Sequence, residues 1–134
     1  MQVKATIRSE MLEVIVTSIT TAPASNTIVF QDASDITIAI MPFKELEAFG
    51  DAQYKFKALD DSFSLKASVI QNGRVSKFII DGEEIGGGGP INALNGSAGG
   101  LNSNSDIRFN RRDWSESGVI TLNNLTLKLI QGQA

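Results

Sequence analysis

The sequence predicts an all-β, mainly antiparallel domain, built as a β-sandwich, a jelly-roll-like fold or a small barrel, with one short helix and one long glycine-rich loop. Short segments in which apolar and polar residues alternate recur along the chain, most clearly at 54–58 and 63–69. Turn-forming residues separate about ten such segments at close spacing. Eight of the twelve glycines fall between Asp81 and Asp106, where the alternation stops.

Strands are expected from the beginning of the chain. Val3, Ala5 and Ile7 alternate with polar neighbours, and the apolar run 14–16 is typical of a strand covered on both faces. The segment TTAPASN, with its proline, serine and asparagine, predicts a loop. Two further short strands are expected at 27–31 and 36–41.

The predicted helix covers 42–50, with the sequence PFKELEAFG. Pro42 suits the first position of a helix, and Gly50 suits its C-terminal end. Phe43, Leu46 and Phe49 would share one side. A helix of about two turns depends on packing rather than on propensity, so we expect it to cover one end of a sheet.

The clearest alternation follows this segment and predicts two half-buried antiparallel strands joined through Asp60-Asp61. Their inward residues are Tyr54, Phe56 and Ala58 in the first strand, and Phe63, Leu65, Ala67 and Val69 in the second. Asn72-Gly73 predicts a hairpin between SVIQ and RVSKFII, because both residues tolerate positive φ. Asp81-Gly82 predicts another turn that leads into a brief strand.

The C-terminal part predicts strands at 107–110 and 119–130. The phase of the apolar residues changes at Asn123-Asn124 within the second of these segments. A one-residue change of phase moves every later side chain to the other face of a strand, so a bulge or a tight turn is expected there.

Composition excludes several classes of function. A chain of 134 residues is expected to form one domain over 1–134 and to bury roughly 68% of its unfolded surface. The absence of cysteine excludes disulfides, thiolate metal sites and cysteine nucleophiles, and the absence of histidine removes the usual general base. A net charge of −3 disfavours bulk nucleic-acid binding. No signal peptide or membrane-spanning run is evident, so we expect a start in the cytoplasm and no membrane partner.

The spacing of the acidic residues matches no catalytic or metal-binding motif. Adjacent carboxylates at Asp60-Asp61 and Glu83-Glu84 would point to opposite faces of a strand, so neither doublet forms the pair that a glycosidase needs. DGEEIGGGG lacks the spaced ligands of a calcium loop, and GGGGP lacks the lysine of a phosphate-binding loop. We therefore predict no catalytic residue, cofactor or metal, and assign Asp60-Asp61 to a turn.

The glycine-rich segment 86–105 is the first candidate for function. It carries three large apolar residues, Ile91, Leu94 and Leu101, which gain nothing in a solvated loop. Two interpretations stay open. The segment is either a flexible or extended loop, or an arm that packs against another subunit.

A basic and aromatic cluster in IRFNRRDW is the second candidate. It contains Arg108, Arg111, Arg112 and Trp114. Guanidinium and indole groups are frequent in interface hot spots, so the cluster could contact a phosphate, a sugar ring or an acidic partner. In the other interpretation Trp114 caps the core, and the arginines pair with Asp106, Asp113 or Glu116.

These features favour a non-catalytic assembly protein that contacts copies of itself and other assembly subunits. The class that fits is a small virion component of a tailed phage, such as a decoration, connector or tail subunit, assembled in the host cytoplasm. Its mechanism would be geometric, with the 86–105 arm burying its apolar residues on a neighbour.

The alternative is a carbohydrate-binding or adhesive module. The ending GVITLNNLTLKLI resembles the last strand of jelly-roll carbohydrate-binding modules. This resemblance implies a glycan ligand, which Trp114 and Tyr54 would contact by stacking. A hydrolase built on carboxylates fits less well, since the usual bases are missing.

Overall fold

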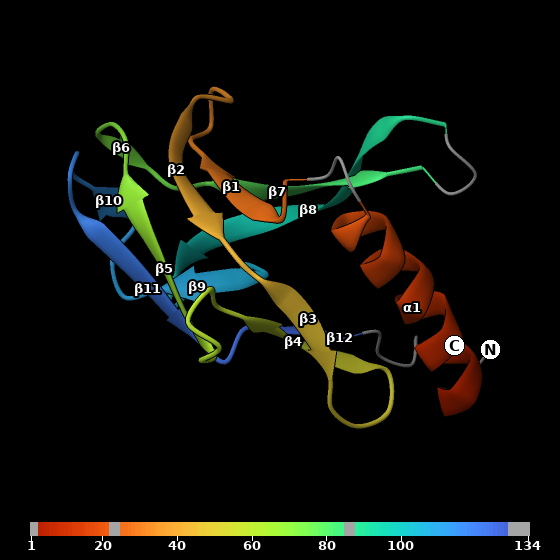
Figure 1. Ribbon diagram of the computed structural model, residues 1–134. Helices are drawn as coiled ribbons and strands as arrows, with labels where there is room; N and C mark the ends of the chain where they lie inside the picture. The colour runs from red at the N-terminus through yellow and green to blue at the C-terminus, as the bar shows by residue number, and fades with distance from the viewer. Residues whose placement is uncertain (1–2, 22–24, 85–87, 129–134) are drawn as a thin grey trace.

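The computed structural model of the chain describes residues 3–21, 25–84 and 88–128. These residues form one helix and twelve strands (Figure 1). In chain order they are α1 (Ala5–Thr20), β1 (Thr27–Gln31), β2 (Thr37–Pro42), β3 (Glu45–Ala48), β4 (Gln53–Lys57), β5 (Ser64–Val69), β6 (Gly73–Arg74), β7 (Lys77–Glu83), β8 (Pro90–Gly100), β9 (Ile107–Phe109), β10 (Asp113–Trp114), β11 (Val119–Asn123) and β12 (Thr126–Lys128).

The strands form a mainly antiparallel, barrel-like sheet that is nearly closed. Seven strands pair in the order β11-β5-β2-β1-β7-β8-β9, and a three-stranded sheet has the order β12-β4-β3. Short connections lead from β2 into β3 and from β11 into β12, so the smaller sheet continues the larger one (Figure 1). β8 and β9 pair in parallel, and the other described pairs are antiparallel. The prediction of a mostly β, mainly antiparallel fold is confirmed.

The core lies inside this curved sheet. In β1 the inward residues are Ile28 and Phe30, both 0% exposed, and in β5 they are Leu65, Ala67 and Val69. The period of two places alternate residues on opposite faces of a strand, and in β5 this alternation is visible in the sequence. No helix in the described ranges combines the length and the apolar content that a bilayer span requires.

The two strands predicted at the N-terminus are wrong, because residues 5–20 form α1. Leu12, Ile15, Val16 and Ile19 follow the i, i+3, i+4, i+7 spacing of a helix and face the rest of the protein. The segment contains neither glycine nor proline. Its β-branched residues resemble a strand locally, but the longer period decides the structure.

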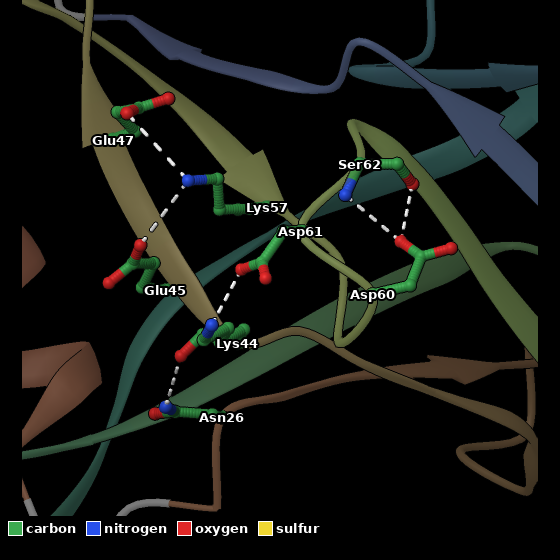
Figure 2. Close-up of polar contacts among 8 residues, drawn as sticks. All are labelled: Asn26, Lys44, Glu45, Glu47, Lys57, Asp60, Asp61 and Ser62. Carbon is green, nitrogen blue, oxygen red and sulfur yellow. Dashed lines mark hydrogen bonds and ion pairs between the residues drawn. The ribbon is translucent and has the colours of Figure 1, made fainter.

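The helix predicted at 42–50 is also wrong. Residues 45–48 form β3, which pairs with β4. Leu46 points into the core, whereas Glu45 and Glu47 point outward and lie 3.6 and 3.8 Å from Lys57 Nζ (Figure 2). A period of two therefore fits this segment better than the helical spacing of its aromatic residues.

The predicted Asn72-Gly73 hairpin does not form. β5 pairs with β2 and β11, whereas β7 pairs with β1 and β8. Asp81-Gly82 makes no turn either, since β7 continues to Glu83 with a shift of register after Ile80. The turn expected at Asn123-Asn124 is confirmed between β11 and β12, and Asn124 has a φ of 58°.

The glycine-rich loop predicted at 86–105 is wrong for most of its length, because residues 90–100 form β8. Residues 86 and 87 lie outside the described ranges. Glycine is needed in β8 for close packing. A methyl group at Gly96 would lie 2.5 Å from Asp106 Oδ2 and 2.8 Å from Phe78 Cε1. The close backbone approach suggested by the glycines thus occurs within this chain.

Candidate protein interface

Two of the predicted interface residues, Ile91 and Leu101, lie at opposite ends of β8. Ile91 is near the start of the strand, and Leu101 follows its last residue. An 11-residue strand spans about 35 Å. Figure 1 shows α1 beside the β7–β8 hairpin, with β9 and β10 toward the opposite side of the molecule. The structure therefore separates residues that the sequence grouped into one arm.

At the first end, α1 and the β7–β8 hairpin enclose a groove of about 390 Å³. Ser18 Oγ donates a hydrogen bond of 2.7 Å to the main-chain oxygen of Glu83, which fixes α1 against the hairpin. The groove is lined by Val14, Ile15, Ser18, Glu83, Glu84, Ile91 and Ala93.

An apolar stripe on α1 leads into this groove. The α1 stripe consists of Ile7, Met11 and Val14, which are 45%, 49% and 54% exposed. Their i, i+4, i+7 spacing places them on one side of the helix. Ile91 is 39% exposed and lines the groove together with Val14. Four large apolar side chains on two adjoining elements are thus open to solvent.

Four glutamates lie on the two elements that carry this apolar surface. Glu83 and Glu84 line the groove, and Glu10 and Glu13 are exposed on α1. None of these four takes part in an ion pair within the described ranges. Arg8, on the same helix, is directed to the main chain, where its Nη1 donates to the Val3 oxygen at 3.0 Å. We call the groove, the α1 stripe and the four glutamates the acidic end.

The basic end lies at the other end of β8 and consists of Leu101, Arg108, Arg111 and Arg112. Leu101 is 56% exposed, and the three arginines are exposed as well. Arg108 stands opposite Gly99 in the β8–β9 pair, and its Nε donates to the Ser105 oxygen at 3.2 Å. The stem of Arg112 passes beside Gly100, and its Nη2 donates to the Val75 oxygen at 3.4 Å.

Asp113, one of the carboxylates expected to pair with these arginines, binds Arg74 instead. Asp113 accepts hydrogen bonds from Arg74 Nε at 2.9 Å and Nη2 at 3.2 Å. These bonds hold the pKa of Asp113 below its usual value, and the charges of Arg112 and Arg111 add to the effect. No ion pair of Arg108, Arg111 or Arg112 is found in the described part of the chain.

Trp114 belongs to the core and is therefore not a residue of the candidate interface. It is 5% exposed and packs edge-to-face on Phe30 and Phe109, with ring centroids 5.6 and 4.9 Å away. Its Nε1 donates a 2.7 Å hydrogen bond to the Arg111 oxygen. The indole thus fixes the main chain that carries Arg111, and it offers no exposed ring for stacking on a sugar.

Leu94 lies at neither end. It is half-buried beside a separate apolar groove of about 330 Å³, at the seam where β12 faces β8 and β9. Phe56, Phe78, Ile80, Ile107, Leu125 and Leu127 also line this groove. Leu94 therefore packs against the core at the open seam of the barrel.

The acidic doublet Asp60-Asp61 has a structural role (Figure 2). Asp60 accepts hydrogen bonds from the Ser62 nitrogen at 2.9 Å and from Ser62 Oγ at 2.6 Å. Asp61 Oδ1 lies 2.5 Å from Lys44 Nζ. These hydrogen bonds lower the pKa of both carboxyls. In the described ranges no three Asp, Glu, His or Cys side chains come together as a metal-binding group.

The α1 stripe is the part of the surface that the sequence analysis missed. The sequence feature that could have identified it is a run of sixteen residues without glycine or proline. In this run, apolar residues recur at helical spacing on two adjacent faces. Arg74 was missed as well, because β6 and β10 bring it to Asp113 from 39 residues away.

Comparison with family models, with curated proteins and with solved structures gave no match to this chain.

Proposed function

We propose that this chain is a non-catalytic assembly protein that acts through contacts with copies of itself and with other assembly subunits. The observation that supports this function is the exposure of four large apolar side chains, Ile7, Met11, Val14 and Ile91, on two adjoining elements. Burying exposed apolar surface is the main driving force of protein association.

The composition of α1 strengthens the proposal. A helix on the surface of a protein normally has one apolar face toward the core and a polar face toward water. In α1, Leu12 and Ile19 are almost fully buried, while the α1 stripe is apolar and exposed. A helix that is apolar on both faces needs a second covering surface, and a neighbouring subunit supplies one.

The setting that we propose is the virion of a tailed phage, in which this domain would be a decoration, connector or tail subunit. This finer assignment rests on sequence features: no cysteine, no histidine and no set of catalytic residues. Repeated contacts between rigid β domains suit a ring or a shell, in which one interface is used many times.

The carbohydrate-binding alternative loses its main support. It required an exposed aromatic platform, and Trp114 is buried between Phe30 and Phe109. Tyr54, the other residue of that hypothesis, is half-buried in β4 and packs against the core.

Sedimentation velocity tests the proposed function. Wild-type protein is expected to form oligomers as its concentration rises, and Met11→Glu is expected to stay monomeric, because a carboxylate cannot be buried in an apolar contact without a large cost. Thr6→Glu is the matched control, since Thr6 is exposed on the same helix outside the α1 stripe. A wild-type protein that remains a monomer, or a Met11→Glu variant that assembles like wild type, contradicts the proposal.

A further inference from the structure

We infer that copies of this chain associate head to tail, the acidic end of one copy binding the basic end of the next. This inference rests on the proposed function and specifies its partner surface. The partner is a second copy of this chain, and the contact joins two different surfaces.

Charge complementarity is the first argument. The acidic end presents Glu10, Glu13, Glu83 and Glu84, and the basic end presents Arg108, Arg111 and Arg112. Within the described ranges, none of these seven residues takes part in an ion pair. Opposite potentials on two surfaces steer association and fix the orientation of the partners.

Apolar complementarity is the second argument. Leu101 is 56% exposed and stands at the end of β8 beside the arginines. The groove at the acidic end is a concave site of about 390 Å³ whose apolar residues include Val14, Ile15 and Ile91. Leu101 therefore has the character of an apolar anchor with arginines nearby, and the groove has that of an apolar socket with two carboxylates in its lining.

The distance between the two ends shows that their contact must be intermolecular. The two ends are separated by the length of β8, about 35 Å, so they cannot meet in the same molecule. A contact between two different surfaces leaves one free end on each outer copy. Such a heterologous contact repeats until it closes a ring or continues as a filament.

A symmetric dimer through the α1 stripe fits less well. In an antiparallel helix pair centred between Ile7 and Val14, a two-fold axis places Glu10 beside the partner's Glu10. Like charges at such a position are destabilising. The head-to-tail contact instead places these glutamates near arginines.

Charge reversal in two separate variants tests the inference. Arg108→Glu with Arg111→Glu reverses the basic end, and Glu13→Arg with Glu84→Arg reverses the acidic end. Lys66→Glu with Lys128→Glu is the control for the first pair, because it makes the same change of net charge at exposed residues outside both ends. Light scattering gives the molar mass of each variant and of an equimolar mixture.

Each reversed variant is expected to need on the order of tenfold higher concentration to assemble, since like charges then face each other. The mixture is expected to regain assembly, because each reversed end then finds a complementary end, and the control is expected to assemble like wild type. The inference is overturned if the arginine variant assembles like wild type, or if the mixture does not recover. If Met11→Glu still abolishes assembly in that case, the result supports the proposed function and contradicts only the head-to-tail geometry. A wild-type protein that never assembles contradicts both the proposed function and the head-to-tail inference.

Discussion

Ser18 and Glu83 connect the helix to the sheet, because Ser18 Oγ donates a 2.7 Å hydrogen bond to the main-chain oxygen of Glu83. The two residues are 65 positions apart in the chain. Ser18 is buried, and this bond satisfies its hydroxyl group. It sets the position of α1 on the hairpin, and with it the groove between Val14 and Ile91.

Gly82 makes this approach of α1 to β7 possible. A methyl group at position 82 would lie 2.5 Å from Ser18 Oγ and 2.8 Å from Ala93 Cβ. We expect Gly82→Ala to lower the free energy of unfolding by about 1–3 kcal/mol, the usual cost of overpacking. Urea unfolding followed by circular dichroism measures the loss. Gly100→Ala is the control, because its nearest atoms would be 3.6 Å away. Equal stability of the two variants would contradict the packing described for α1.

Acid is expected to destabilise the folded protein through three aspartates. Hydrogen bonds from Ser62, Lys44 and Arg74 lower the pKa of Asp60, Asp61 and Asp113, respectively, below the usual value of 3.8. A pKa that is lower in the folded state adds stability above the unfolded pKa, and this stability is lost as the pH falls through the folded pKa. The urea midpoint should therefore fall below a pH of about 4.

The Asp61→Asn variant isolates one of these contributions. It removes the titrating carboxyl but keeps the size of the side chain, so the urea midpoint should depend less on pH between about 2 and 5 than that of wild type. Asp51→Asn is the control, because Asp51 is exposed and makes no ion pair among the described residues. An unchanged pH dependence in Asp61→Asn would show that the Lys44–Asp61 contact adds no stability.

Trp114 is expected to stabilise the fold and to play no part in ligand binding. Trp114→Ala should cost about 3–5 kcal/mol, as large-to-small changes of buried aromatic residues do. Trp114 is the one tryptophan of the chain, so its fluorescence reports on its surroundings. Titration with oligosaccharides should leave the spectrum unchanged. A shift or quench that saturates with sugar would favour the carbohydrate-binding alternative.

Strands with local alternation were predictable from the sequence. β4, β5 and β9 lie within two residues of their expected positions, because their apolar residues alternate with polar ones. β1 and β2 do so as well, because short apolar runs rich in β-branched residues favour strands. The same local rule failed for α1, where Val14, Ile15 and Val16 have strand propensity but a helical period governs packing.

Pairing between distant segments was not predictable in the same way. Asn72-Gly73 has the composition of a hairpin turn, yet Gly73 pairs with Trp114 across the β6–β10 sheet. The glycines of β8 are typical of a loop in the sequence. In the structure Gly96 leaves room for the side chains of Asp106 and Phe78, which are distant from it in the chain. The arrangement of the candidate site was not predictable for the same reason. Ile91, Leu101 and the arginines were recognised as residue types, whereas their division between two ends depends on the length of β8.

Oxidation of Met11 by hydroxyl radicals tests most directly whether the α1 stripe is covered by another subunit. Met11 is 49% exposed, and Met41, at 0%, is the internal control. Exposed methionine is readily converted to its sulfoxide, which mass spectrometry detects. We expect Met11 to be oxidised several-fold less in concentrated, assembled protein than in dilute protein, with Met41 unreactive in both. If Met11 is oxidised to the same extent in the dilute protein and in the assembly, the α1 stripe is not the surface through which this protein associates.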